Sequence, residues 1–422
     1  MRGLHGLKFS FDNLGLMKAL ESRILDQIQQ AGGWIGFDEF MQAALYTPGL
    51  GYYSGGGVPF SDPQAVGRGD FVTSPMLGPW MADAIWSWAQ PLSVPSTGLG
   101  RQPARLRIRE FGGGRGDLAA ELMRRTPAGA IDFEMLETSA DLQQMQRERT
   151  HGLGAIRWAR QLEPGFQGLV IANEVLDAMP VKCFEWMGPE GVREWGVALA
   201  DAHRAADNRH EFLWAAQPAG HLLADAVAAR AAAAAARGQA WDCGYRGEWS
   251  PWFGPWLQSL FESMDVGAVL LIDYGFARPE LDHPGRCDGT ICAHYQHRRI
   301  DAREELLRRV GIQDLTAHVD FTEVAQQARL VGFDVSGFVT QARFLINSGL
   351  LQRAQPVIER TTDPADRARL LHQLQMLVSE SEMGEVFKVL LLTKGLETQS
   401  LTALTDPAFA SGDRLASLFS DQ

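Results

Sequence analysis

The sequence of 422 residues predicts an α/β fold, in which a doubly wound, mostly parallel sheet is preceded by a helical cap and interrupted by large insertions. Two observations predict it. From residue 105 to residue 275, apolar runs of strand length alternate with segments of helical period, which is typical of βαβ units. The glycine-rich stretch EFGGGRG, residues 110–116, directly follows the first run, where the first strand of a parallel sheet turns into its helix.

Residues 1–100 predict the helical and loop-built cap. MKALESRILDQIQQAGG has a helical period and ends on glycines, and FDEFMQAALYT predicts a second helix that ends before Pro48. A loop rich in glycine and tyrosine, GLGYYSGGG, follows, then GDFVTSP and a third helix in PMLGPWMADAIWSWAQ. The Pro-, Gly- and Ser-rich segment PLSVPSTGLGRQPA predicts a linker at the end of the cap.

Residues 101–400 predict the sheet domain. Its strands are expected at RLRIREF, IDFEMLE, AIRW, GLVIAN, GAVLLIDYG and, late in the chain, VFKVLLLT. Two insertions are expected, at about 200–262, which includes the alanine-rich helix 224–238, and at about 277–312. Residues 401–422 are predicted to be a peripheral tail.

The charge balance bears on the class of partner. Asp and Glu number 51 against 39 Lys and Arg, and the net charge of −12 disfavours a nucleic-acid groove, because neutralising phosphates needs clustered cations. No apolar run reaches the ~20 residues of a membrane-spanning helix. The opening residues resemble neither a secretory signal nor a transit peptide, so we expect a cytoplasmic protein without membrane insertion. The cysteines lack zinc-site spacing, which predicts reduced thiols and no metal at Cys183, Cys243, Cys287 and Cys292.

The glycine stretch predicts that a ligand lies against the backbone. Gly112, Gly114 and Gly116 alternate with other residues after Glu110, and glycine is needed where φ is positive or where a Cβ would clash. A dinucleotide fingerprint would need glycine where Asp117 stands, which disfavours an NAD-dependent enzyme. An acidic residue before alternating glycines is instead typical of class I methyltransferases, which bind S-adenosylmethionine (SAM).

Polar residues also end the second and fourth predicted strands. Glu137 ends IDFEMLE, where a carboxylate can accept from the two hydroxyls of an adenosine ribose, or can serve only as a favourable charge before the next helix. Asn173 and Glu174 end the fourth strand, and Asp177 follows three residues after Glu174. The two carboxylates can hold a guanidinium through its planar donor fork; the alternative is a solvated helix start. Trp158 is either an adenine contact or a core residue.

Ten motifs in order, over roughly residues 35–350, resemble the MidA-like family of SAM-dependent methyltransferases. They are FDEFMQAALYTPGLGYYS, GDFVTSP, REFGGGRGDLA, MLETSADLQQMQ, IANEVLDAMPV, RGEW, LLIDYGF, GTICAHYQHR, QDLTAHVDFT and TQARFLI. The family includes the mitochondrial complex I assembly factor, a protein arginine methyltransferase. The resemblance implies a Rossmann-like class I methyltransferase fold, with SAM as the cofactor and S-adenosylhomocysteine as the product.

The resemblance also implies roles for individual residues. A catalytic role falls on Glu174, aided by Asp177 or by Glu248 of RGEW. Thr316, His318 and Asp320 occupy family-typical positions that either shape the substrate pocket or anchor the insertions. The cofactor-binding residues are expected to be Thr73, Ser74 and Pro75, closing over the methionine end, with Glu110, Gly112, Gly114, Gly116, Glu137 and Asn173.

Together, the residues and the resemblance favour a protein arginine N-methyltransferase that acts on a protein partner carrying an arginine. A respiratory-complex subunit is one candidate partner. Two alternatives remain open at this stage: a SAM-binding assembly factor without catalysis, and a methyltransferase of small molecules. The sequence leaves open whether the chain forms a homodimer.

Overall fold

The structure is a computed structural model that describes residues 5–54, 74–93, 105–200, 212–296 and 298–419. Its centre is a twisted sheet whose main path holds seven strands. In spatial order they are β4 (Ile156–Ala159), β3 (Ile131–Leu136), β2 (Leu106–Phe111), β5 (Phe166–Asn173), β10 (Met264–Phe276), β16 (Phe387–Lys394) and β15 (Asp334–Thr340). The short β14 (Val319–Asp320) pairs with the end of β10.

The order and direction of these strands confirm the predicted α/β class. All neighbouring pairs from β4 to β10 are parallel, and β16 runs antiparallel to both β10 and β15. The strand order reverses at β2, which lies between β3 and β5. In doubly wound sheets, ligands bind at the carboxyl ends of the strands beside such a reversal. The architecture therefore places the expected site where β2 and β5 end.

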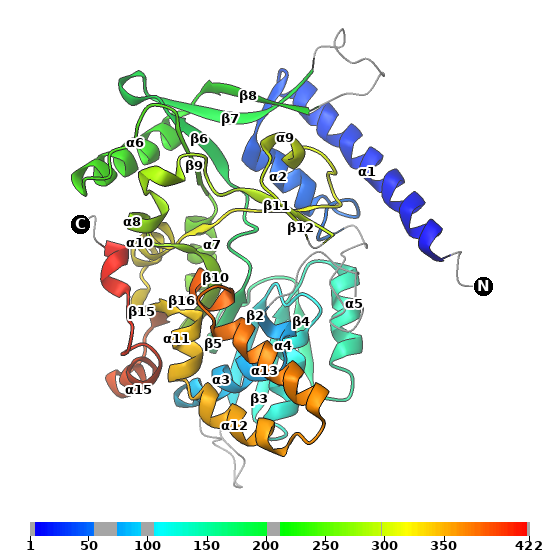
Figure 1. Cartoon of the computed structure of the whole chain (residues 1–422), viewed down its shortest axis with the longest axis vertical. Helices are drawn as coiled ribbons and strands as arrows, with labels where there is room; N and C mark the ends of the chain where they lie inside the picture. Colours follow the sequence, from blue (N-terminus) through cyan, green and yellow to red (C-terminus); the bar gives the residue numbers. More distant parts are fainter. Residues whose placement is uncertain (1–4, 55–73, 94–104, 201–211, 297, 420–422) are drawn as a thin grey trace.

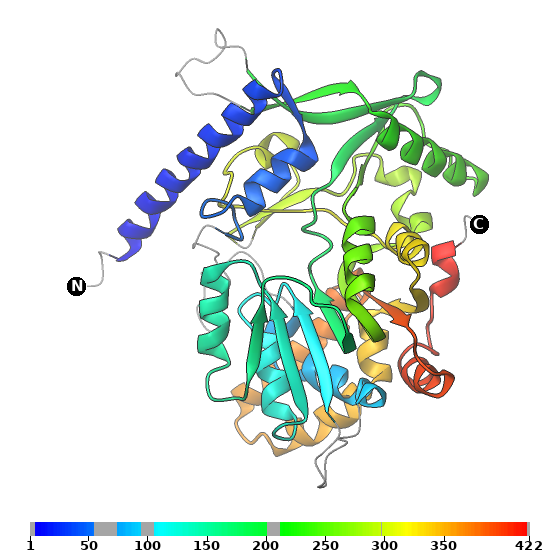
Figure 2. The ribbon, with the colours of Figure 1, turned by 180° about the vertical axis from the view of Figure 1, so that it is seen from behind.

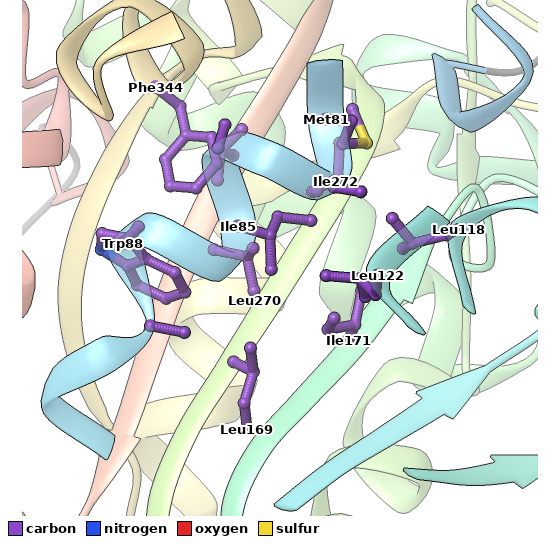
Figure 3. Packing of buried hydrophobic residues seen from close by; sticks show 14 of the residues in the cluster. Met81, Ile85, Trp88, Leu118, Leu122, Leu169, Ile171, Leu270, Ile272 and Phe344 are labelled. Carbon is purple, nitrogen blue, oxygen red and sulfur yellow. The ribbon is translucent and has the colours of Figure 1, made fainter. Parts of the chain in front are cut away.

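Helices cover both faces of this sheet (Figures 1 and 2). Because β5 and β10 are buried on both sides, their sequences are continuous apolar runs, and alternate residues enter opposite cores. Figure 3 shows one core, in which residues of β5 and β10 face α3 (Trp80–Trp88): Leu169, Ile171, Leu270 and Ile272 against Met81, Ile85 and Trp88. The other core lies under α7 (Phe253–Ser263) and α10 (Phe321–Val331).

The remaining helices of the sheet domain have these bounds. They are α4 (Asp117–Arg125), α5 (Ala140–Arg149), α8 (Arg278–Leu281), α11 (Gln341–Asn347), α12 (Leu350–Arg360), α13 (Pro364–Val378), α14 (Met383–Val386) and α15 (Thr398–Ala408). Single 3-10 turns are η1 (Ser74–Met76), η2 (Gln90–Leu92), η4 (Pro284–Arg286) and η5 (Leu415–Phe419). Nowhere in the described part of the chain is a helix both long and apolar enough to cross a membrane.

A second, outer part of the molecule lies beyond the sheet domain, at the top of Figure 1. It holds α1 (His5–Gln30), α2 (Phe37–Tyr46), α6 (His221–Ala236), α9 (Arg303–Leu306) and η3 (Gly188–Glu190). One antiparallel sheet contains β1 (Trp34–Gly36), β7 (Val192–Leu199), β6 (Lys182–Trp186), β9 (Tyr245–Trp249) and β8 (Phe212–Pro218). A small sheet contains β12 (Arg298–Ile300), β11 (Cys292–Tyr295) and β13 (Asp314–Thr316).

The outer part is assembled from segments far apart in the sequence. Strand β1 of the N-terminal segment pairs with β7 of the first insertion, so the cap and the insertion share a sheet. One apolar core contains residues of the cap, of the first insertion and of the second insertion, such as Phe40, Val197 and Leu306. The expected cap and insertions therefore form one structural unit rather than separate additions.

The packing differs from the expected boundaries at four points. Helix α3 lies in the core of the sheet domain rather than in the cap. The first insertion begins at β6, before residue 200, and α7 at its expected end packs on the central sheet. The expected tail is not peripheral, because Leu404 and Leu418 are fully buried against the sheet domain. The helices moved because an apolar helix face is buried by whichever surface it reaches, and the first insertion begins earlier because β6 pairs with β9 of the outer sheet.

Candidate active site

A cavity of about 600 Å³ opens where β2, β3 and β5 end and extends to the small sheet of the outer part. Its inner end is lined by the turn from β2 to α4 and by Glu137. Its outer end is lined by Tyr46, Tyr53 and Asp314. The cavity therefore spans the sheet domain and the outer part, and both contribute polar side chains to one space.

The glycine turn adopts backbone conformations that other residues avoid. Gly112, Gly114 and Gly116 have φ angles of 58°, 50° and 84°. A Cβ on Gly112 would lie 2.9 Å from Cγ2 of Val175, and one on Gly116 would lie 3.3 Å from Cα of Gln146. Glycine is therefore required here both by the left-handed turn and by close neighbours.

Glu110 lies beneath this turn and lines the cavity. Its side chain is buried, and its Oε2 accepts no hydrogen bond from any residue that the structure describes. Burial, with the charges of Asp117 and Glu137, raises the pKa of Glu110 to about 8. A buried acceptor without a partner calls for a donor from a ligand, because leaving such a group unsatisfied costs free energy. A cofactor that brings an ammonium group fits this position.

Glu137 directly follows β3, and two hydrogen bonds hold its carboxylate. The backbone N–H of Ser139 donates to its Oε1 at 2.8 Å, and Nε2 of Gln146 donates to its Oε2 at 3.1 Å. Burial raises the pKa of Glu137, although these hydrogen bonds oppose the shift. Each carboxylate oxygen keeps a further lone pair, so the group can still accept from ligand hydroxyls. The acceptor atoms of Glu137 therefore fit the hydroxyls of an adenosine ribose.

Gln146 on α5 is a site residue that the sequence prediction missed. It is fully buried, and its Nε2 also donates to the carbonyl oxygen of Gly114 at 2.9 Å, which ties the glycine turn to Glu137. Its Oε1 accepts from Nε1 of Trp158, so this tryptophan supports Gln146 from outside the cavity and does not line it. The available signal was the spacing from Leu142, which places Gln146 on the buried face of the helix.

Glu174 follows the last residue of β5 in a left-handed conformation with φ 53°. Its backbone N–H donates to the carbonyl oxygen of Ile272 at 2.9 Å, and Nδ2 of Asn173 donates to its Oε1 at 3.0 Å. The backbone N–H of Ser74 also donates to its carboxylate. Burial and the charge of Asp177 raise the pKa of Glu174 to about 8. Such strain in a residue other than glycine concentrates at functional sites.

The turn after Glu174 is fixed by Asp273 on β10. Oδ2 of Asp273 accepts from the backbone N–H groups of Val175, Leu176 and Asp177 at 3.2, 2.9 and 3.2 Å. Asp177 thereby enters the cavity beside Glu174, and burial raises its pKa to about 6. Asp273 was not predicted as a site residue, although an acid inside the apolar strand LLIDYG was an available signal.

The GDFVTSP segment is described only in part, since Thr73 lies outside the described residues. Ser74 is fully buried and its hydroxyl donates to Oε1 of Gln341 on α11 at 2.9 Å, while Pro75 lines the cavity. The segment is therefore anchored to the sheet domain and reaches the site through the backbone of Ser74.

Glu248 was predicted to contact the guanidinium, but the structure places it outside the cavity. Its carboxylate accepts from the backbone N–H and the hydroxyl of Thr290, both at 3.0 Å, and from the N–H of Ile291 at 3.4 Å. It does not line the cavity. Strand β9 pairs with β6 in the outer sheet and so directs Glu248 to the turn before β11, where it fixes that turn.

The three residues of the TAHVDF motif separate into two groups. Thr316 and His318 line the cavity, and burial together with the charge of Arg299 lowers the pKa of His318 to about 3, so its ring is neutral. Asp320 does not line the cavity. It caps α10 by accepting from the N–H of Glu323 at 2.9 Å, and it pairs with Arg278 at 3.0 Å.

The placement of the predicted site residues is therefore mixed. Ser74, Gly116 and Glu248 support the site without lining it. Tyr46, Tyr53 and Asp314 line the cavity but were not singled out in the sequence. The structure brings these predicted residues to the cavity wall: Pro75, Glu110, Gly112, Gly114, Glu137, Asn173, Glu174 and Asp177.

Comparison with known proteins places this geometry in a family. The family model described as S-adenosyl-L-methionine-dependent methyltransferase matches residues 83–339, more than half of the chain. A crystal structure from Burkholderia thailandensis, bound to S-adenosyl-homocysteine, is 32% identical, with a TM-score of 0.80, over 96% of this chain and 98% of that chain. A native crystal structure from the same organism is 33% identical, with a TM-score of 0.78 and the same coverage.

Curated relatives match over most of the chain. The protein arginine methyltransferase NDUFAF7, mitochondrial, of Danio rerio is 27% identical over 412 residues, which are 89% of this chain and 86% of the relative. The Homo sapiens protein of the same name is 26% identical over 83% of this chain and 78% of the relative. Because the family model spans most of the sheet domain, and a structure alike over nearly its whole length carries S-adenosyl-homocysteine, the chain belongs to the MidA-like family of SAM-dependent methyltransferases and uses SAM as its cofactor.

Proposed function

We propose that the protein is a protein arginine N-methyltransferase. One observation carries the proposal: the cavity beyond the glycine turn presents buried acceptor atoms that have no hydrogen-bond partner among the described residues. They are Oδ1 of Asn173 and Oδ1 of Asp177, and Nδ1 of the neutral His318 also lacks a partner there. A guanidinium offers five N–H donors and no acceptor, so it can satisfy several such atoms at once.

The charges of the site also suit a cation. Glu174 and Asp177 have raised pKa values of about 8 and about 6, because both carboxyls are buried and the charge of Asp177 disfavours that of Glu174. A guanidinium placed between them would replace the protons that they hold and would relieve the repulsion. An acidic acceptor would meet that repulsion instead. The names of the curated relatives support the same class of acceptor.

The chain's own residues then have defined tasks. SAM, when bound, supplies an electrophilic methyl group and a good leaving group. Glu174 and Asp177 would bind the guanidinium and hold one nitrogen in line for attack, which removes most of the entropic barrier. Glu174 would accept the proton that this nitrogen loses, and a pKa of about 8 suits a base that works near neutral pH.

The test is methyl transfer by Glu174→Gln. Labelled SAM is added to a protein extract, and the proteins are hydrolysed to find which amino acid carries the label. We expect methylarginine with the native chain and a rate roughly 10²- to 10⁴-fold lower with Glu174→Gln. SAM affinity, measured by calorimetry, should stay within about 3-fold, since the side chain acts beyond the glycine turn. Glu190→Gln removes an exposed carboxylate and serves as the matched control.

Other outcomes identify the alternatives. Label in small molecules alone would indicate a small-molecule methyltransferase. SAM binding without transfer to any fraction would indicate a SAM-binding assembly factor. Parallel loss of SAM affinity and transfer in Glu174→Gln would contradict the role given to Glu174.

A further inference from the structure

The small sheet of the outer part forms a polar roof over the cavity. Strand β11 lies between β12 and β13, and its His294 stands opposite both Arg299 and Asp314. All three residues line the cavity. They therefore form one row across three strands, with a carboxylate at one end and a guanidinium at the other.

The two faces of this roof differ in chemistry because side chains alternate along a strand. Leu315 on β13 and Ala293 on β11 point the other way and are fully buried in the apolar core of the outer part. That packing fixes the register, since a slip of one residue would place Leu315 in the cavity and Asp314 in the core. The fold thus holds the Asp314 carboxylate over the site although it is only 3% exposed.

Two stacked tyrosines link Asp314 to the turn that carries Asp177. The hydroxyl of Tyr53 donates to Oδ1 of Asp314 at 2.9 Å, and the hydroxyl of Tyr46 donates to the carbonyl oxygen of Ala178 at 2.8 Å. The two rings stack with centroids 5.6 Å apart. Burial, and then the charges of Asp314 and Asp177, raises the pKa of Tyr46. Both carboxylates are therefore close to the same stacked pair, one from the outer part and one from the sheet domain.

We propose that Asp314 is a specificity-determining residue that binds the acceptor guanidinium from the roof, with Tyr53 as its positioning residue. This inference rests on the proposed function. A guanidinium is a planar fork with donors on more than one edge, so carboxylates on separate elements can bind separate edges. A lysine ammonium is a compact point charge that cannot span them in the same way. Asp314 thus makes the site selective for arginine over lysine.

The test is Asp314→Asn, which keeps the oxygen that accepts from Tyr53 and removes the charge. The probes are a synthetic peptide with one arginine, taken from a protein labelled in the extract, and the same peptide with citrulline, which is neutral and nearly isosteric. We expect the KM for the arginine peptide to rise roughly 10- to 100-fold, the cost of a charge-assisted hydrogen bond. SAM affinity and inhibition by the citrulline peptide should not change.

Two further variants separate binding from folding. Glu304→Gln removes an exposed carboxylate from the same insertion and should leave the KM unchanged. Tyr53→Phe removes the hydroxyl that orients Asp314 and should raise the KM by a smaller factor, with kcat nearly preserved. The citrulline peptide is the decisive readout, because a damaged pocket would weaken both peptides equally.

The outcomes distinguish the two proposals. If the native chain methylates arginine and Asp314→Asn keeps the native KM, the role of Asp314 is wrong while the proposed function stands. Equal loss of arginine and citrulline binding would likewise overturn the charge-specific role. If the native chain labels no arginine, both proposals fall together.

Discussion

Glu174 is the residue at which stability and function oppose each other. A left-handed backbone in a residue other than glycine costs roughly 1–2 kcal/mol, and desolvation of the carboxyl, which raises its pKa, adds a further cost. The strands on either side hold it in place, since its N–H donates to the carbonyl oxygen of Ile272 on β10. Glycine would relieve the strain, but only the carboxylate can bind a cation.

The titration of Glu174 and Asp177 predicts the pH dependence of acceptor binding. The pKa values are raised, to about 8 for Glu174 and about 6 for Asp177, so at neutral pH the pair holds about one proton, mainly on Glu174, which a bound guanidinium must displace. Affinity for the arginine peptide should therefore rise with pH, by up to about tenfold per unit between pH 6 and pH 8, where one proton is displaced, and level off above pH 8. In Glu174→Gln the upper step should disappear. A flat profile of kcat/KM between pH 6 and pH 9 would contradict this assignment.

At the scale of the element, the turn from β2 to α4 depends on glycine for two separate reasons. Gly114→Val should abolish detectable SAM binding, because a branched side chain is strained at φ 50° and Gly114 lines the cavity in which the cofactor is expected. Gly152→Val is the matched control, since Gly152 also has positive φ, at 77°, but open space around its Cβ and no place in the cavity. Calorimetry should show binding lost only in the first variant; SAM affinity retained there would refute the placement of the cofactor.

The turn after β5 shows how one strand shapes another. Its residues 174–177 contain the acids that were predicted from their position after a strand, but the turn itself is held by three backbone donors to Asp273. That contact joins elements nearly a hundred residues apart, so a local reading of NEVLDAMP could identify the acids and not their support. The identity of the acids could therefore be predicted from the local sequence, whereas the conformation of their turn depends on a distant strand.

At the scale of the whole molecule, the last helix tests the packing of the expected tail. Leu404 on α15 is fully buried in the core beside α3. We expect Leu404→Ala to lower the free energy of unfolding by roughly 2–5 kcal/mol, measured by urea denaturation, because it leaves a cavity. Leu222→Ala, at a side chain 69% exposed on α6, should change it by less than about 0.5 kcal/mol. Equal effects would show that the tail does not pack.

The two parts of the molecule are tied by a buried ionic network. Arg230 of α6 pairs with Asp282 and donates to the carbonyl oxygen of Glu248, while Arg278 pairs with Asp320 at the start of α10. These contacts join the outer part to the sheet domain beside the segment that carries Thr316 and His318. The cavity is thus formed between two bodies whose relative position is fixed by paired charges.

The sequence by itself determined most strands of the central sheet, the glycine turn and the acids that follow the strands, but it did not predict the edge strand β15. These features are local: a strand, its turn and the polar residue after it are adjacent in the chain, and all parallel strands of one sheet end at the same edge. The order of the motifs also predicted the family and its cofactor, and the comparisons confirm both.

Only the tertiary structure decided three features: the small sheet over the cavity, the residues that support the site from behind it, and the boundaries of the structural units. Tyr53 and Asp314 are 261 residues apart, and no local pattern pairs them. Glu248 went to a turn of the outer part instead of the cavity, because strand pairing, and not its motif, sets the direction of its side chain. Such contacts depend on which apolar faces pack against one another across the whole chain. This packing is determined only when the molecule folds.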